Sequence, residues 1–434
     1  MVLLKRHLLK QQFNNSVSYV IFHTNYTNMK NLLLFFLFIT SIPFCVVGQK
    51  ADELFVKAQS GDTEAMVDLG LCYCMGEGVD INYTKAMEWF SKAAAKGSAN
   101  AMHKIGLLYA HGDGITQDYH KAEQWWLNAA EKGNCVAMCD LGILYASNDS
   151  LKDNSKAQKW FEESAKNGNA NAMYCLGARY EIGDGVSRDY NKAIEWYKKA
   201  ANSGNEKAMN NLGTMYANGI GVQKDTLQAC KLYEMAAKSG HVIAMNNLAC
   251  ELIKNIRVEY RNQAIDWFIK AAEKGNVNSM INLGILYERG QEVEKDYAKA
   301  LKWYKEAADN GNEQALYSIG IFYENGFGVE ANLSKAVEYF KQAHLQDYLP
   351  ATAKLGQMYY DGVFFQQDYQ KAFELFYRAA NRHYNPSGDA MNYLSSCYRY
   401  GLGTEKNLKI AEWYLEKAQL FGNDDANRLK SLIE

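Results

Sequence analysis

The sequence predicts an all-α protein, a solenoid of tandem two-helix repeats, and three observations lead to this fold class. The chain repeats itself at a spacing of 36 residues through most of its 434 residues. Apolar residues inside each copy recur with the period of an α-helix. Only three prolines occur in the chain, which leaves long helices uninterrupted. One repeating architecture is therefore favoured over two or three separate globular domains.

Ten copies of the repeat can be aligned between residues 65 and 425. Seven of them span 36 residues, two span 35 and the ninth spans 39. Two short helices cannot bury their apolar faces alone, so each copy needs its neighbours and the array should form a continuous core. The copies begin at Ala65, Ala101, Ala137, Ala172, Ala208, Ala244, Ser279, Ala315, Ala351 and Ala390.

Residues 172–204 form a clean copy and illustrate the first helix and its end. Ala172, Leu176 and Tyr180 are spaced at i, i+4 and i+8, which places them on one face of an α-helix. Gly183 and Gly185 end this helix, because glycine permits the positive backbone angles that a tight turn between helices requires. We therefore expect a helix–turn–helix unit in each copy.

The second helix of this copy is predicted to begin after Asp189, an N-cap residue, and to end at Gly204. Equivalent N-caps are expected in the other copies at Asn82, Asp118, Asp225, Asp296, Asn332, Asp368 and Asn407.

Tryptophan recurs at the same position of the second helix in several copies. These rings are expected to wedge against alanine and glycine surfaces of adjacent helices, as parts of the core and not of a cofactor site. They are Trp89, Trp125, Trp160, Trp196, Trp267 and Trp303.

The repeated pattern Ala-x-x-x-Leu-Gly-x-x-Tyr-x-x-Gly-x-Gly-Val-x-x-Asp-x-x-Lys-Ala-x-x-Trp-Tyr-x-x-Ala-Ala-x-x-Gly resembles the Sel-one-like repeat (SLR) family, a relative of the tetratricopeptide repeats (TPR), over residues 65–425. The resemblance implies a right-handed superhelix with a concave groove that binds partners. Members of the family act as adaptors in membrane-protein complexes, in quality control or in bacterial host interaction.

Some copies depart from this pattern. Copies three and six lack the turn glycines and carry residues 147–150 and 254–257 in their place. Copies eight and nine replace the terminal glycine with Asp347 and His383, so a bend of the superhelix is expected near residues 345–390.

The two ends of the chain differ from the repeats. A basic start near Met29, an apolar run over residues 32–47 and small residues near Gly48 predict a secretory signal cleaved after Gly48. Residues 1–48 are thus interpreted as an N-terminal extension and signal, with Met29 as the expected start. Residues 49–64 should form a half-repeat cap, and residues 426–434 a C-terminal capping helix. Periplasmic or secreted localisation in a bacterium follows from this interpretation.

Charge and metal-ligand spacing restrict the choice of partner. The net charge is −2 and the basic residues are scattered, so nucleic acid is not an expected partner. His103 and His111 lie about 12 Å apart by helical rise, too far to share an ion, so no metal and no cofactor are expected. The cysteines show no regular disulfide spacing, and most of them are expected to be buried small hydrophobic residues. Membrane contact is expected only through an uncleaved signal or a membrane-protein partner.

The third, fourth, seventh, tenth and eleventh positions of each first helix fall away from its Ala/Leu/Tyr face and should line the groove. Asparagine occupies such places in three successive copies. A ladder of amides can bind an extended peptide backbone of any sequence, or the amides can bridge neighbouring helices, and the sequence favours neither. The ladder comprises Asn210, Asn211, Asn246, Asn247 and Asn282.

A set of tyrosines also maps to groove positions. Tyrosine gives a large contact area at a low cost in rotamer entropy, although scattered surface tyrosine is the favoured interpretation in so tyrosine-rich a chain. The set is Tyr174, Tyr317, Tyr360, Tyr393 and Tyr400.

The sequence contains no phosphate loop, nucleophile elbow, zinc helix or Ser-x-x-Lys helix, and the recurring Gly-x-Gly-Val follows a helix, so it is a turn. We therefore predict a non-enzymatic exported scaffold that binds a protein or peptide. One alternative is a secreted SLR-type enzyme acting on β-lactam or peptidoglycan-like ligands, a subgroup with a regular cysteine pair in each copy. Another is an adaptor of quality control in the endoplasmic reticulum lumen, compatible with glycosylation sites at Asn82, Asn148 and Asn332.

Overall fold

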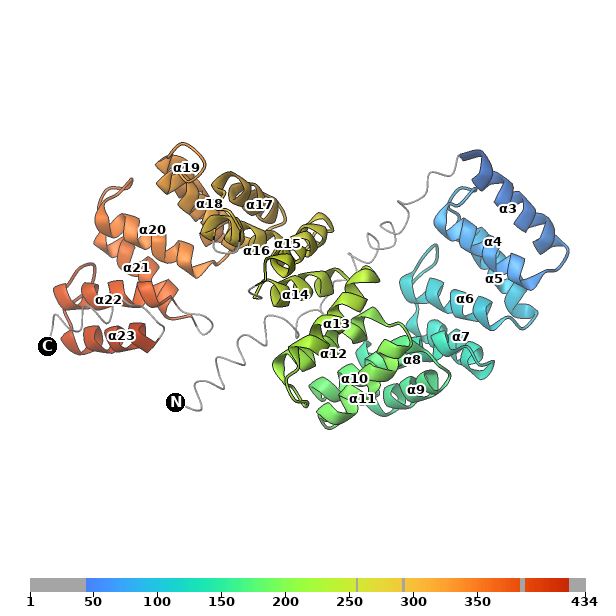
Figure 1. Cartoon of the computed structure of the whole chain (residues 1–434). Helices are drawn as coiled ribbons and strands as arrows, with labels where there is room; N and C mark the ends of the chain where they lie inside the picture. Colours follow the sequence, from blue (N-terminus) through green and yellow to red (C-terminus); the bar gives the residue numbers. More distant parts are fainter. Residues whose placement is uncertain (1–43, 255–256, 291–292, 383–386, 421–434) are drawn as a thin grey trace. The chain divides into compact units, whose positions relative to one another are not determined.

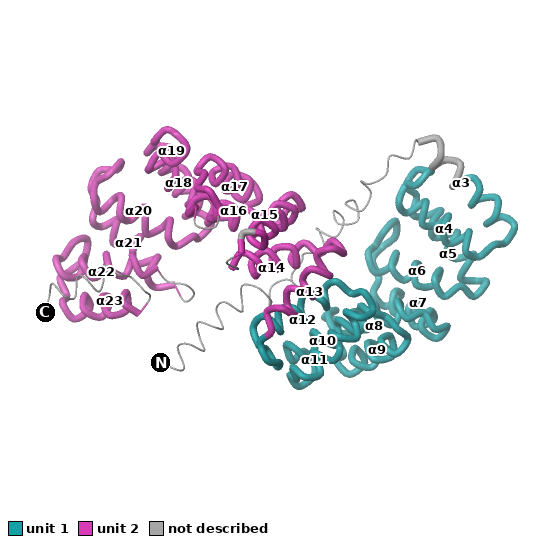
Figure 2. Tube along the Cα trace, viewed as in Figure 1, with its two compact units in different colours: residues 1–224 teal, residues 225–434 magenta. Residues whose placement is uncertain are grey.

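The computed structural model describes residues 44–254, 257–290, 293–382 and 387–420. Over these ranges the chain forms 21 helices, α3 to α23, and no strand, so the all-α prediction is confirmed (Figure 1). The chain divides into two compact units, unit 1 of residues 1–224 and unit 2 of residues 225–434 (Figure 2).

In both units, consecutive helices pack against one another along the chain. A first helix therefore lies between the second helix of its own copy and that of the copy before, as α6 lies between α7 and α5. Unit 1 holds α3 (Phe44–Gln59), α4 (Thr63–Met75), α5 (Tyr83–Ala95), α6 (Ala99–His111), α7 (Tyr119–Glu131), α8 (Cys135–Ser147), α9 (Asn154–Lys166), α10 (Ala170–Ile182), α11 (Tyr190–Asn202) and α12 (Glu206–Asn218). Unit 2 holds α13 (Thr226–Lys238), α14 (Val242–Leu252), α15 (Val258–Glu273), α16 (Val277–Arg289), α17 (Tyr297–Asp309), α18 (Glu313–Asn325), α19 (Leu333–Leu345), α20 (Leu349–Asp361), α21 (Tyr369–Ala380), α22 (Gly388–Tyr400) and α23 (Leu408–Leu420).

The predicted helix boundaries are confirmed by their hydrogen bonds. The Asp189 side chain accepts from the backbone N–H groups of Asn191 and Lys192 at the start of α11. The other seven predicted N-caps accept in the same way, which satisfies donors that have no partner inside the helix. Gly183 ends α10 with φ 79° and ψ 34°, the left-handed conformation that glycine adopts without strain.

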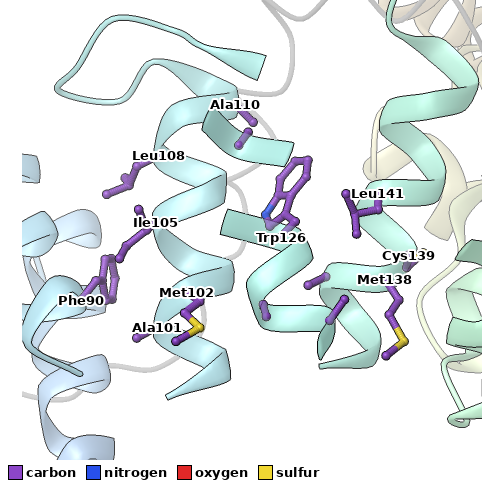
Figure 3. Close-up of a cluster of buried hydrophobic side chains, with 14 of the residues drawn as sticks. Phe90, Ala101, Met102, Ile105, Leu108, Ala110, Trp126, Met138, Cys139 and Leu141 are labelled. Carbon is purple, nitrogen blue, oxygen red and sulfur yellow. The ribbon is translucent and has the colours of Figure 1, made fainter. Parts of the chain in front are cut away.

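In most copies the core is built from a glycine on the first helix that faces an aromatic ring of the second. A Cβ atom added to Gly106 of α6 would lie 2.3 Å from Nε1 of Trp126 on α7, so the two helices are in close contact at this point. Trp126 also donates to the carbonyl oxygen of His103 at 3.2 Å. Figure 3 shows this cluster, with Trp126 beside the apolar residues of the neighbouring helices. The same arrangement recurs in unit 2, where Gly320 faces Phe340.

The expected role of the tryptophans needs correction. Trp89 and Trp303 are buried, whereas Trp125, Trp160, Trp196 and Trp267 are only half-buried. The ring that meets the glycine belongs to the next residue along the chain, as Tyr197 meets Gly177. Trp196 instead lies under the ammonium group of Lys199, 4.2 Å from the ring centroid. The tryptophans therefore cover the edge of the core, and the following aromatic residue fills its centre.

Departures from the repeat pattern change the turns locally. In copy three, Asn148 caps α8 in an extended conformation in place of left-handed glycine. Asp347 stands where a terminal glycine is usual and still adopts φ 61°, so the backbone course there matches that of a glycine. Its carboxylate accepts from Arg378 and, at 2.9 Å, from Arg382. His383 lies outside the described residues, as do residues 384–386, and the bend expected near residues 345–390 stays a prediction.

The N-terminal half-repeat is helical, but α3 starts at Phe44, before the predicted cleavage point after Gly48. The signal segment up to residue 43 and the capping helix expected at residues 426–434 lie outside the described residues. Among the helices that the structure describes, none combines the length and the hydropathy needed to cross a membrane.

Candidate functional site

Side chains at the third and fourth positions of successive first helices meet one another. In unit 1, His103 Nε2 of α6 lies 2.6 Å from Asp140 Oδ2 of α8. In unit 2, Asn282 of α16 donates to Asn246 Oδ1 of α14 at 3.1 Å. In each pair the third position of one copy contacts the fourth position of the next. This recurring contact, which we call the ladder contact, defines the register between neighbouring first helices.

Asn210 and Asn211 occupy these positions at the end of unit 1. Asn210 is 7% exposed and donates to Asn211 Oδ1 at 3.3 Å. Asn211 donates to the hydroxyl of Tyr197 at 3.2 Å, and that hydroxyl donates to Glu181 Oε2 at 2.6 Å. Burial raises the pKa of Glu181 above its usual value, an effect that the hydrogen bond from Tyr197 opposes. These amides thus belong to a network that joins α10, α11 and α12.

The three asparagines of unit 2 form a second network. Asn246 is 8% exposed, and its Oδ1 accepts from Ser279 Oγ at 3.0 Å as well as from Asn282. Its Nδ2 donates to Asn247 Oδ1 at 3.5 Å. Asn282 and Asn247 remain half-buried. The structure therefore brings the asparagines together within each unit in the bonds expected of residues that bridge neighbouring helices.

Four of the five candidate tyrosines pack against other rings. Tyr174 lies 5.9 Å from Tyr197 in unit 1, measured between ring centroids. In unit 2, Tyr360 and Tyr393 lie 5.4 Å apart, and Tyr393 stacks on Phe376 at 4.6 Å.

Tyr317 lies 5.6 Å from both Phe340 and Tyr348. Tyr400 differs from the other four, since 68% of it is exposed. The candidate tyrosines are thus mostly half-buried parts of aromatic clusters, and Tyr400 presents the largest accessible ring among them.

Unit 1 contains an apolar pocket of about 210 Å³ between α8 and α10. Most of its lining comes from the first-helix positions that the sequence predicts for the groove. Tyr174 and Cys175 are the third and fourth positions of α10, and Ile143 is the seventh position of α8. Ile143 and Ile182 remain 44% and 43% exposed at the pocket. An opening with exposed aliphatic residues can accept an apolar side chain of a partner.

The buried guanidinium group of Arg179 lines part of this pocket. Arg179 is 4% exposed and donates to Asp184 Oδ2 at 3.2 Å and to Gln158 Oε1 at 3.3 Å. Burial lowers the pKa of Arg179, and Asp184 opposes that shift. The position is apolar in most copies, for example Leu108 and Leu144. Sequence reasoning missed Arg179, although a charged residue at a position that is apolar in most copies was a usable signal.

The Sel1 repeat family model matches ten segments of the chain, in the same register as the copies described above. They are residues 63–98, 99–134, 135–169, 170–205, 206–241, 242–276, 277–312, 313–348, 349–384 and 388–418. The chain belongs to the Sel1 repeat family.

The chain is also similar to solved structures of Sel1 repeat proteins. The chain is 31% identical to a protective antigen of uropathogenic Escherichia coli strains that displays an SLR fold, with 88% of this chain and 90% of that chain covered and a TM-score of 0.43. It is 27% identical to a Sel1 repeat protein from Oxalobacter formigenes, with 72% and 90% covered and a TM-score of 0.58. A comparison with curated proteins gives no match.

No disulfide joins the cysteines of this Sel1 repeat chain in the described residues. Cys139 and Cys175 occupy a ladder contact and are close enough to shift each other's pKa, a pairing that sequence reasoning did not predict. Across the described ranges, no three His, Cys, Asp or Glu residues gather as metal ligands would. His103 contacts Asp140, and His111 lies 3.6 Å from Asp113, each within a pair.

Proposed function

We propose that this Sel1 repeat protein is an exported, non-enzymatic scaffold that binds a segment of another protein along the first-helix face of unit 1. Sel1 repeats form a scaffold fold that commonly binds proteins. The observation that carries the proposal is the apolar pocket of about 210 Å³ between α8 and α10. A partner would insert a large apolar side chain there, between Ile143 and Ile182.

The proposed segment is extended and carries an apolar anchor residue. The ladder contacts run beside the pocket, and the half-buried Asn211 lies one copy beyond Tyr174. Amide groups at such places can exchange hydrogen bonds with a peptide backbone, while the pocket selects one side chain. Affinity would then depend mainly on the anchor, and the amides would contribute less.

Selection of peptides from a random displayed library against the full chain tests this function directly. Peptides that bind should share a large aliphatic or aromatic residue. Ile143→Asp combined with Ile182→Asp should weaken their binding by roughly 10- to 100-fold, because burial of such a side chain contributes about 1.5–3 kcal/mol. Leu227→Asp, at an exposed apolar residue of α13, is the matched control and should bind as the unchanged chain does.

Two outcomes would contradict the proposal: no peptide is selected, or the control and the pocket variant lose affinity equally. The variant with alanine at all five asparagines is a poor substitute for this experiment. Asn210 and Asn246 are buried and hydrogen-bonded, so their removal changes the packing of helices together with any contact to a partner.

Export is tested by the N-terminus of the chain isolated from cells. A secretory signal cleaved after Gly48 leaves a chain that begins at Gln49 and is recovered outside the cytoplasm. Intact-mass measurement and N-terminal sequencing of the chain from each cell fraction identify its first residue and its location. Recovery of a chain that still contains the apolar run, in the cytoplasm alone, would contradict export.

A further inference from the structure

Cys139 of α8 and Cys175 of α10 stand at the third and fourth positions of neighbouring copies, so the repeat register itself brings them together. One copy earlier, the same register places His103 and Asp140 in contact at 2.6 Å. One copy later, Asn211 lies close enough to Tyr174 to affect the pKa of its hydroxyl. Three consecutive ladder contacts in unit 1 therefore pair the same two positions, and the middle one brings two thiols together.

The separation of the two helices suits a bond between these thiols. α8 and α10 approach to within 8 Å between Cα atoms. A disulfide requires Cα atoms about 4.4–6.8 Å apart with both Cβ atoms directed toward each other. The equivalent pairs His103–Asp140 and Asn246–Asn282 bring their polar atoms to 2.6 Å and 3.1 Å, so this register directs the two side chains toward each other. The thiols of Cys139 and Cys175 are close enough to shift each other's pKa.

The two thiols differ in their surroundings. Cys139 is 3% exposed and packs in the core of unit 1, whereas Cys175 lines the apolar pocket. The hydrogen bond from Cys139 lowers the pKa of Cys175, and the positive charges of Lys207 and Arg179 act in the same direction. The pKa of Cys139 is raised. Cys175 is therefore the accessible thiol and the more readily ionised one.

We propose that Cys139 and Cys175 form a reversible dithiol–disulfide couple that links α8 to α10, with a small-molecule disulfide as the oxidant that enters through the pocket. This couple is a modification site of the chain and does not rest on the proposed binding function. Formation of the disulfide would cross-link copies three and four beneath the pocket.

The oxidation proceeds by two exchange steps. The Cys175 thiolate attacks one sulfur of the oxidant, which breaks the oxidant's S–S bond, forms a mixed disulfide and releases one thiolate. Cys139, after losing its proton, attacks the Cys175 sulfur of the mixed disulfide and releases the second thiol of the oxidant. The protein loses two protons and two electrons, and the oxidant disulfide gains them and becomes two free thiols.

The other cysteines have no equivalent position. Cys250 holds a hydrogen bond from Asn282 Nδ2 at 3.6 Å, so its neighbour in the next copy is an amide. Cys135 is the competitor to exclude, because it precedes Cys139 by one turn of α8. Cys135 and Cys139 also fall in one tryptic peptide, which ends at Lys152. The assay must therefore separate these two residues.

The test equilibrates the full chain with excess oxidised glutathione, alkylates the remaining thiols in denaturant and maps the tryptic peptides by mass spectrometry. We expect a peptide that links residues 133–152 to residues 167–179, and its loss after dithiothreitol. Cys135→Ser should keep this link, and Cys250→Ser should oxidise as the unchanged chain does. Cys139→Ser and Cys175→Ser should each abolish the link.

The single variants also test the order of the steps. Cys139→Ser should accumulate glutathione on Cys175, because the second exchange has lost its thiol, whereas Cys175→Ser should leave Cys139 unmodified. Two free thiols at Cys139 and Cys175 in the unchanged chain after oxidation would overturn the proposal, as would a link that Cys135→Ser removes. Fragmentation of the linked peptide from the unchanged chain locates the bond at Cys139 or at Cys135, and this result decides the matter even where a variant fails to fold.

Discussion

Units 1 and 2 use the same positions of the first helices for different chemistry. In unit 1 the ladder contacts include an imidazole–carboxylate pair, His103 with Asp140, and a pair of thiols, Cys139 with Cys175. In unit 2 they include an amide pair, Asn246 with Asn282, and farther along Tyr393 of the fourth position stacks on Phe376. The repeat determines that the third and fourth positions of neighbouring first helices meet. The side chains at these positions can vary between copies, because the recurring packing of the core involves other positions.

The core that both units share is the contact between a first-helix glycine and a second-helix ring. Gly142 faces Phe161 in unit 1, and Gly356 faces Phe376 in unit 2, with closest approaches of 2.6 Å and 2.8 Å for an added Cβ. The two phenylalanines are 2% and 0% exposed. The comparison between the units therefore predicts a core that is common to both and ladder contacts that differ between copies. Four experiments test this prediction.

The largest effect is expected from removal of the buried ring. Phe161→Ala and Phe376→Ala should each lower the free energy of unfolding by about 3–5 kcal/mol, the usual cost of a cavity of that size. Urea denaturation followed by circular dichroism measures both variants. A cost in one unit less than half of that in the other would show that the units do not share the same core.

A methyl group added at the glycine position should have the next largest effect. Gly106→Ala places a Cβ 2.3 Å from Trp126, and overpacking of this kind costs about 1–3 kcal/mol, part of which the better helix propensity of alanine offsets. Copy six carries Ala249 at this position, fully buried near Phe268, so its neighbourhood already accommodates the methyl group. Ala249→Gly is the matched control, and thermal unfolding compares the two. A Gly106→Ala variant as stable as the unchanged chain would disprove the tight contact.

Loss of a helix cap should have a smaller effect that is similar in both units. Asn82 and Asn332 accept from the backbone N–H groups of Lys85 and Lys335, each at 3.0 Å. Asn82→Ala and Asn332→Ala should each cost about 1 kcal/mol, the typical contribution of such a cap. Asparagine→Asp at the same sites retains the acceptor and should restore most of the stability. Equal losses with alanine and aspartate would point to a role other than capping.

The repeat, its caps and its turns could be predicted from the sequence because each depends on residues close together in the chain. Asp189 and Gly183 act within one or two turns of their own helix. The tryptophan prediction was wrong at Trp196, since Tyr197 beside it is also aromatic and a small change in helical phase decides which ring faces Gly177.

Contacts between copies were less accessible to sequence reasoning. The pairing of Cys139 with Cys175 depends on the register between α8 and α10, which no local pattern encodes. The burial of Arg179 depends on the turn residue Asp184 and on Gln158 of another helix. The groove positions were predicted from helical phase alone, and the apolar pocket lies at such positions in copies three and four.

The smallest expected effect is a pH dependence that originates in unit 1. Burial raises the folded-state pKa of Glu181, so its contribution to stability is present below the usual value of 4.5 and is lost as the pH rises through the raised value. Glu181→Gln keeps an acceptor for the Tyr197 hydroxyl and removes the charge. The stability of this variant relative to the unchanged chain should therefore increase from about pH 4 to about pH 7. Glu195→Gln, an exposed residue of α11, is the control, and its stability should change with pH in parallel with that of the unchanged chain. Parallel curves for Glu181→Gln as well would mean that the carboxyl is solvated and that the network joining α10, α11 and α12 does not depend on its charge.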